Sequence, residues 1–289
     1  MNTEPTTVLE ERLQEDPLFG RHHWDAVAAA TLHATPARAW RSYMRRVYLR
    51  LLKEWFAEET ANYVLKTDLF EEAVTPHYLL ADVGPLRIGI DASAVVVRAA
   101  RERLLKQGFE CLFIIGDLRQ LPLRPGSVRQ ILSGSSLDHF PEKADIARSL
   151  RQLAQTLPFG GTLVITFDNP HNPVVWVRNH LPFAWLNRLG LVPYYVGATY
   201  TQEEARRQIE AAGLTLTDMT VVAHAPRALM IGLVALSERF GWGWLEALVA
   251  GFLNRCEALA LWPTRFVTGY YLAFRAEKRA APTQPSAGL

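Results

Sequence analysis

Residues 86–93, L-R-I-G-I-D-A-S, have the pattern of a buried β-strand that ends in a carboxylate and leads directly into a helix. The apolar run has the length and the β-branched residues of a strand, and Asp91 ends it. Ser93 is a suitable N-cap for a helix that runs through Gln107 and ends at Gly108. Because a strand followed at once by a helix is the unit of a parallel sheet, this stretch predicts an α/β fold.

The same pattern recurs along the chain. Short apolar runs occupy residues 63–68, 111–117, 129–135 and 161–168. They alternate with helix-like segments such as residues 140–157. Runs of this length that are rich in Ile, Val, Leu and Phe are typical of a parallel sheet covered by helices on both faces.

The second half of the chain continues this alternation. Thr201 is the expected N-cap of a helix with Glu204 at the capping-box offset, and the helix is expected to end at Gly213. A further strand is expected over residues 214–222, and a last strand over residues 265–275.

Three segments lie outside this alternation, and they define the expected domain organisation. Residues 1–60 are expected to form an N-terminal helical lid, because apolar and aromatic residues recur at helical spacing from about Leu18 to Glu59. The α/β domain is expected over residues 61–278, with an apolar, Trp-rich helical insert at about 226–262. Residues 279–289 are rich in Ala, Pro and Ser and predict a disordered tail.

Composition excludes several classes of function. The net charge of +2 is too small for the electrostatic footprint of nucleic-acid binding. The two cysteines, Cys111 and Cys256, offer neither a disulfide framework nor the spacing of a metal site, which fits a reducing cytoplasm. The N-terminus lacks the order of a signal peptide, and no apolar run reaches the length of a membrane span. We expect a cytoplasmic protein, with peripheral membrane contact left open.

The predicted strands end in polar residues, and in an open α/β sheet ligands bind at the carboxyl ends of the strands. Asp91 ends the second strand and suits a ribose, because a carboxylate accepts hydrogen bonds from both hydroxyls of a diol. Asp117 ends the third strand, where it can accept from the exocyclic amine of an adenine. Leu118 and Ile90 would supply apolar walls for the ring.

At this point the chain resembles the class I S-adenosylmethionine-dependent methyltransferases. Four segments carry the resemblance by their order and spacing: R-I-G-I-D-A-S (87–93), G-D-L-R-Q-L-P-L-R-P-G-S-V (116–128), L-R-Q-L-A-Q-T-L-P-F-G-G-T-L-V-I-T (150–166) and E-A-R-R-Q-I-E-A-A-G-L (204–214). The resemblance implies S-adenosylmethionine as cofactor. It also implies a Rossmann-like α/β fold: a seven-stranded, mostly parallel sheet whose last strand is antiparallel, with the helical lid and the insert added.

The resemblance also implies roles for residues at matching positions. Asp91 and its neighbour Ala92 would lie at the ribose, and Asp117 with Leu118 at the adenine. Ser133 and Gly134, which end the fourth strand, would pass under the methionine part of the cofactor.

The first motif departs from the family. The family places several glycines after its first strand, whereas this chain has D-L-F-E-E-A at residues 68–73. One solution is that Asp68 receives the ammonium of the cofactor and Lys66 or Thr67 receives its carboxylate. The alternative for Lys66 is a solvated or ion-paired lysine.

Methyl transfer to a hydroxyl requires a base that removes the proton of the acceptor. His139 and His171 both follow predicted strand ends, and His23, next to His22, could reach the site from the lid. For each histidine the alternative is a polar residue that caps a helix or satisfies a loop. No metal is expected, because adjacent residues such as His22 and His23 point apart on a helix.

The lead-in helices, residues 169–188 and the Trp-rich insert are strongly apolar. They suit a small hydrophobic acceptor such as a lipid, an isoprenoid or a secondary metabolite, methylated at oxygen or carbon. One alternative is a methyltransferase-like protein that has lost catalysis and serves in binding or assembly. A less favoured alternative is an NAD(P)-dependent oxidoreductase, since Asp91 follows Asp68 at a spacing near that of Rossmann enzymes.

Overall fold

The computed structural model describes residues 20–32, 38–56, 63–75, 78–84, 86–189, 192 and 195–280. Most of the predicted C-terminal tail and residues 1–19 of the predicted lid lie outside these ranges. The described residues form a seven-stranded sheet in the order β3-β2-β1-β4-β5-β7-β6. The strands are β1 (Val64–Thr67), β2 (Arg87–Asp91), β3 (Leu112–Ile115), β4 (Gln130–Gly134), β5 (Thr162–Asp168), β6 (Thr215–Val222) and β7 (Tyr271–Glu277).

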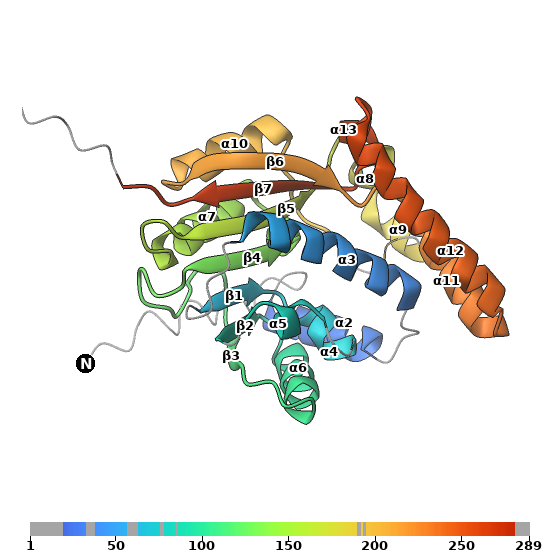
Figure 1. The fold of residues 1–289 in the computed structure, drawn as a ribbon, viewed down its shortest axis with the longest axis horizontal. Helices are drawn as coiled ribbons and strands as arrows, with labels where there is room; N and C mark the ends of the chain where they lie inside the picture. The colour runs from blue at the N-terminus through green and yellow to red at the C-terminus, as the bar shows by residue number, and fades with distance from the viewer. Residues whose placement is uncertain are drawn as a thin grey trace, which may run out of the picture.

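The first five strands are parallel, and β7 runs antiparallel between β5 and β6. This is the Rossmann-like order that the resemblance implied, so the predicted fold is confirmed. The strand order reverses between β1 and β4, which are neighbours in the middle of the sheet. The carboxyl ends of the parallel strands therefore meet at one edge, at the right in Figure 1, around a topological switch point.

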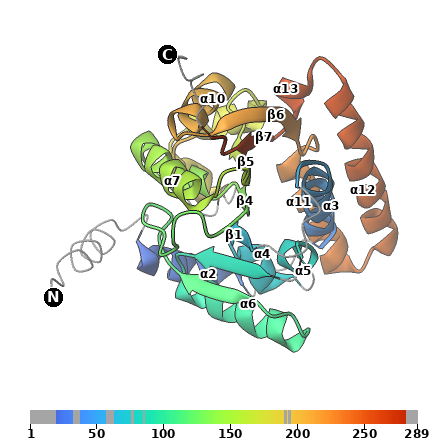
Figure 2. The ribbon, with the colours of Figure 1, turned by 60° about the vertical axis from the view of Figure 1, so that its left-hand side comes forward.

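Helices cover the two faces of the sheet in separate layers (Figures 1 and 2). One face carries α3 (Arg38–Trp55), α11 (Arg227–Phe240) and α12 (Gly243–Cys256), and the other carries α7 (Lys143–Thr156) and α10 (Gln202–Ala211). Each face of the sheet packs against its helices in a separate apolar core, and successive side chains of a strand point to opposite faces. Leu132 of β4 therefore packs with α3, while its neighbour Ile131 packs with α7 and α10.

A third apolar cluster lies beside β2. It joins α2 (Arg21–Thr31), α4 (Phe70–Val74) and α6 (Ala94–Lys106) around the fully buried Leu69. The remaining short elements are α5 (Leu79–Asp82), η1 (Leu137–His139), α8 (Pro173–His180), α9 (Phe183–Arg188), η2 (Glu257–Leu261) and α13 (Arg265–Thr268).

Both predicted N-caps are present. Ser93 Oγ accepts a hydrogen bond from the backbone N–H of Val96. Thr201 and Glu204 form a reciprocal capping box at the start of α10. These caps involve residues three apart in the chain, which is why the local sequence was enough to find them.

Three local predictions need correction. The predicted last strand includes α13, because only residues from Tyr271 onward pair with β5 and β6. The predicted helix from residue 140 begins at Lys143, since Pro141 holds the preceding residue Phe140 in an extended conformation. The edge strand β3 is not covered on both faces: Leu112 and Ile115 are exposed, because residues 116–129 form no helix over it.

None of the helices in the described part of the chain combines the length and the apolarity needed to cross a bilayer.

Candidate active site at the carboxyl ends of the strands

The loop after β1 explains how a glycine-free first motif fits this fold. Leu69 is fully buried, and a Cβ built on Gly89 of β2 would lie 2.6 Å from Leu69 Cδ2. That distance is well below van der Waals contact. The bulk in the loop is therefore accommodated by a glycine in the neighbouring strand, and the loop rests against β2.

Asp91 ties this loop to the start of α6. Its Oδ2 accepts the backbone N–H of Leu69 at 3.0 Å, and its Oδ1 accepts the N–H of Ser93 at 2.8 Å. Burial, and after it the charge of Asp68, raises the pKa of the Asp91 carboxyl to about 7. Asp68 in turn accepts the N–H of Phe70 at 2.9 Å. Two carboxylates thus lie close together at the ends of β1 and β2.

The nearby Lys66 forms its ion pair with Glu72 of α4. Its ammonium donates to Glu72 at 2.8 Å and to the backbone carbonyl of Asp68, and both side chains of the Lys66–Glu72 pair are almost fully buried. The carboxylates of Glu72 and Asp68 outweigh the effect of burial, so the pKa of Lys66 is raised. Lys66 thus forms a buried ion pair with Glu72, and its contact with the cofactor stays a prediction.

Helix α2 lies across the strand ends. Asp25 accepts from Ser93 Oγ at 2.5 Å and from the N–H of Val95 at 3.1 Å, which holds α2 against the first turn of α6. One residue earlier, the ring of Trp24 packs edge-on to His139, with 4.9 Å between ring centroids. The helix therefore spans from the end of β2 to the loop after β4.

Hydroxyl groups link β1 to β4 beneath this helix. Thr67 Oγ1 donates to Ser133 Oγ at 2.9 Å, and Ser136 Oγ donates to the Thr67 carbonyl at 2.7 Å. Both Thr67 and Ser133 are buried. A Cβ on Gly134 would lie 3.3 Å from the hydroxyl of Tyr48, so this glycine leaves room for the tyrosine of α3.

The loop after β4 is held in an unusual conformation. Ser135 has φ of 50°, a left-handed value that is uncommon for a residue other than glycine. Its N–H donates to Thr166 Oγ1 at 2.9 Å, and the same hydroxyl pairs with Tyr48 at 3.0 Å. Strained loops of this kind are concentrated at functional sites.

A second acidic pair lies at the end of β5. Asp138 accepts from Ser135 Oγ at 2.9 Å and from the N–H of Asp168 at 2.8 Å. Burial, followed by the charge of Asp168, raises the pKa of Asp138 well above its usual range. Asp168 instead forms an ion pair with Arg178 of α8.

The three candidate bases differ in their surroundings. His139 is half-buried against Trp24, and burial lowers the pKa of its imidazole, so the ring is neutral at pH 7. His23 also contacts Trp24, with 5.0 Å between ring centroids. His171 is exposed on the loop after β5, where its N–H donates to Asn169. The structure thus brings His139 and His23 to one indole ring.

The expected adenine end is partly occupied by a protein cation. The Asp117 carboxylate accepts from Nε and Nη2 of Arg119, at 2.9 and 2.7 Å from Oδ2, and Arg119 also binds Asp145 at 3.0 Å. Leu118 is half-buried beside the core, and Ala92 is half-buried after Asp91.

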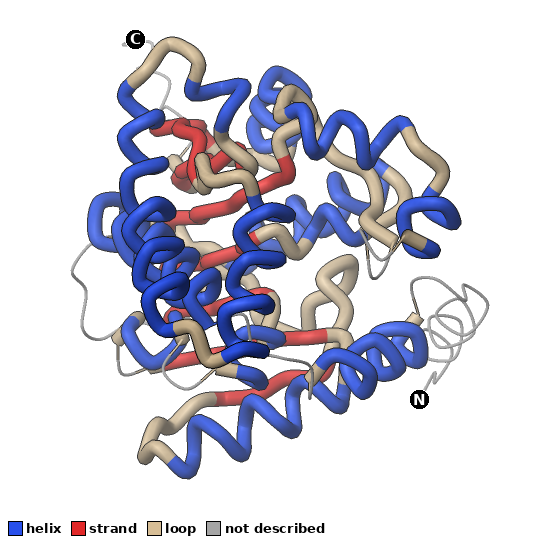
Figure 3. The backbone as a smooth tube through the Cα atoms, turned by 90° about the vertical axis from the view of Figure 1, so that its right-hand side faces the viewer, coloured by secondary structure: helices blue, strands red, loops and turns tan. Residues whose placement is uncertain are grey.

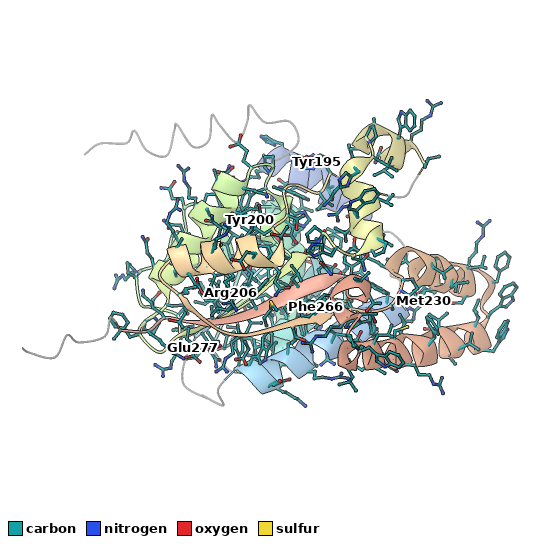
Figure 4. All side chains as sticks on the ribbon, turned by 90° about the horizontal axis from the view of Figure 1, so that it is seen from above. Tyr195, Tyr200, Arg206, Met230, Phe266 and Glu277 are labelled. Atoms are coloured by element: carbon teal, nitrogen blue, oxygen red, sulfur yellow. The ribbon has the colours of Figure 1, made fainter. Side chains whose placement is uncertain are left out.

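A cavity of about 290 Å³ lies beside the end of β5, under α8 and α9. Its lining is mixed: Leu181, Phe183, Leu186 and Tyr195 contribute apolar and aromatic groups, and Lys143, Arg178, Asn179 and Thr199 contribute polar ones. Figure 4 labels Tyr195, which lies beside the two helices. Through Arg178, the lining of the cavity includes one partner of the Asp168–Arg178 ion pair.

Several of these residues were not found from sequence. Asp138 precedes the candidate base His139, and Asp168 is the last residue of a predicted strand. Their position after predicted strands is therefore the sequence signal that could have identified both. Tyr48 lies in an ordinary apolar helix face, and Arg178 is one of many arginines. Nothing local distinguishes those two.

The arrangement is suited to a ligand that brings hydrogen-bond donors and a positive charge to Asp68 and Asp91. Among the described residues there is no cluster of three or more His, Cys, Asp or Glu that could hold a metal ion. Figure 3 looks onto this edge of the sheet and shows helices on both sides of the strand ends.

Comparisons with known proteins agree with this architecture. Residues 77–161 match a family model described as a methyltransferase domain. No curated protein matches the sequence.

Among solved structures, a chain of the complex between the Haloferax volcanii Trm112 methyltransferase activator and a methyltransferase is similar, with 19% identity and a TM-score of 0.57; the match covers 91% of this chain and 99% of that one. The [4+2]-cyclase SpnF has 18% identity and a TM-score of 0.55, with 86% of each chain covered. A Haemonchus contortus phosphoethanolamine N-methyltransferase has 16% identity and a TM-score of 0.55, over 89% of this chain and 60% of that one. At these identities the likeness concerns the fold.

Proposed function

We propose that the protein binds S-adenosylmethionine and transfers its methyl group to a small hydrophobic acceptor, because residues 77–161 match a methyltransferase-domain model and the sheet has the class I strand order. Structures similar to this chain include a phosphoethanolamine N-methyltransferase solved with S-adenosylmethionine.

The pair of carboxylates at the ends of β1 and β2 carries the proposal. Burial, and after it the negative charge of Asp68, raises the pKa of Asp91, so the two carboxylates are close enough to repel each other. Two ribose hydroxyls that donate to Asp91, and an ammonium near Asp68, would relieve this repulsion. The residues present therefore fit the cofactor. When bound, it supplies an electrophilic methyl group on a sulfonium.

The protein's own part is to position the acceptor and to take its proton. The cavity lined by α8 and α9 contains the apolar side chains of Leu181, Phe183 and Leu186, which suit a hydrophobic acceptor. His139 is neutral at pH 7 and lies near the charges of Asp68 and Asp168. These carboxylates would stabilise the imidazolium that forms when His139 accepts a proton from an acceptor hydroxyl. His23 and His171 remain alternative bases.

Calorimetry with S-adenosylmethionine tests the cofactor. The wild-type protein should bind, and Asp91→Asn should lose most of the affinity, because an amide offers one acceptor oxygen where a carboxylate offers two. Asp218→Asn is the matched control, because Asp218 lies on the distant strand β6, where it pairs with Arg275 of β7. This variant should bind S-adenosylmethionine like the wild-type protein. If the wild-type protein does not bind, the proposal is wrong.

A second assay separates binding from chemistry. His139→Ala should retain cofactor binding and should lose about 10²- to 10⁴-fold in methyl transfer to a panel of apolar hydroxyl acceptors. His171→Ala serves as the comparison. A protein that binds the cofactor yet methylates none of the panel would favour the binding or assembly role, and binding of a nicotinamide cofactor instead would favour the oxidoreductase.

A further inference from the structure

Two helical projections leave the molecule on the same side as the strand ends. The α11–α12 projection, residues 227–256, follows β6, and the α8–α9 projection, residues 173–189, follows β5. Figure 1 shows α11 and α12 extending past the end of the sheet, and Figure 4 shows both projections, in orange and yellow, with side chains reaching outward.

Each helix of the α11–α12 projection has apolar side chains on two faces. The inner face packs on α3 through residues such as Val234 and Val249. A second apolar stripe repeats at helical spacing on the outside, where the side chains are 41–67% exposed. These exposed residues are Leu229, Leu236, Phe240, Trp244, Leu248 and Phe252. The outer stripes take no part in the core of the described fold.

The turn between α11 and α12 ends in a stack of three aromatic rings. Phe240 stacks on Trp242 with 5.0 Å between ring centroids, and Trp242 lies 6.3 Å from Trp244, with interplanar angles of 22° and 27°. All three side chains are exposed. The stack is therefore a preformed apolar tip, and ordering it has already cost most of its side-chain entropy.

The α8–α9 projection has the same character. Trp176, Leu181, Trp185 and Leu189 are all exposed. The sequence contains no aspartate or glutamate between Asp168 and Glu203, so this whole segment carries only positive charge.

Charge on the two projections is one-sided. The exposed charged residues are arginines, namely Arg188, Arg239 and Arg255. The acids of the α11–α12 projection, Glu238 and Glu246, are half-buried, and Glu238 accepts the backbone N–H of Arg38 at 3.0 Å. The outer surface therefore combines aromatic rings with guanidinium groups.

We propose that the two projections dock this protein peripherally on an anionic lipid bilayer. Tryptophan prefers the region between water and hydrocarbon, and arginine can bury its stem there while its guanidinium binds a lipid phosphate. A bilayer surface is fluid and can meet two separate convex tips at once, whereas a rigid protein partner would need a single complementary face. Contacts of this kind use apolar burial and charge together.

This docking would turn the strand-end site toward the bilayer. Arg178 pairs with Asp168 at the root of the α8–α9 projection, and Arg227 stacks on Tyr270 at the root of the other. An acceptor dissolved in the bilayer would then have a short path to the site. That consequence rests on the proposed function, but the docking itself does not.

Vesicle flotation of the full-length protein tests the docking without cofactor or acceptor. The vesicles are phosphatidylcholine alone and phosphatidylcholine with phosphatidylglycerol. We expect binding to the anionic vesicles that weakens as salt is added. Trp242→Ser with Trp244→Ser should lower the partition coefficient by about tenfold or more, because two exposed indoles no longer enter the interface.

Phe159→Ser is the matched control, because Phe159 is 65% exposed in the turn before β5, at the opposite end of the sheet. This variant should bind like the wild-type protein. Near-ultraviolet circular dichroism verifies that each variant is folded. The proposal is overturned if the wild-type protein does not bind anionic vesicles, or if the double Trp variant binds as well as the wild type. It is also overturned if gel filtration shows a dimer that the double substitution dissociates while no vesicle binding is seen. Failure of cofactor binding in calorimetry would leave this test unaffected.

Discussion

The contact between Leu69 and Gly89 predicts a specific coupling between the first loop and the second strand. In Gly89→Ala the new Cβ would lie 2.6 Å from Leu69 Cδ2, and a normal contact of about 3.6 Å requires a displacement of about 1 Å. Leu69 is fully buried, so the displacement should cost about 1–3 kcal/mol of unfolding free energy. Because the N–H of Leu69 donates to Asp91, we also expect weaker binding of S-adenosylmethionine.

Leu69→Ala alone should cost about 2–5 kcal/mol, because it leaves a cavity. In the double variant the methyl group at position 89 occupies part of that cavity, so the total cost should be below the sum of the two single costs by about 1 kcal/mol or more. Urea unfolding of the four proteins measures this coupling. Strictly additive costs would show that the two residues do not share this space and would refute our explanation of the glycine-free motif.

Two further predictions concern buried charge at the same edge. Lys66→Met should lower the unfolding free energy by about 3–5 kcal/mol, because it leaves Glu72 buried without its partner. The double variant Lys66→Met with Glu72→Leu should recover most of that loss in urea unfolding. Equal instability of the single and double variants would contradict the ion-pair assignment. The folded-state pKa of Asp91, about 7, lies above its unfolded value, so this carboxyl lowers the unfolding free energy as pH rises from about 4 to about 7. The charged form is also the one that accepts from a ribose, so calorimetry should show cofactor affinity rising between about pH 6 and about pH 8 in the wild-type protein and staying flat in Asp91→Asn.

The order of strands and helices was determined by local sequence. Apolar runs that end in Asp91, Ser133 or Asp168 predict buried parallel strands, and the caps at Ser93 and Thr201 depend on residues only three positions away. Such signals are short-range hydrogen bonds and side-chain periods, which a single sequence displays directly.

The tertiary structure decided which of these residues contact each other. Tyr48 pairs with Thr166 across 118 positions of the chain, and this contact depends on how α3 is oriented on the sheet. The same holds for Lys66, whose ion pair with Glu72 depends on where α4 places a carboxylate. The sequence by itself therefore determined the sheet and the polar strand ends. Only packing over long sequence distances decided how Leu69, Lys66 and Asp91 share the first loop, because that outcome depends on space and burial that no local pattern records.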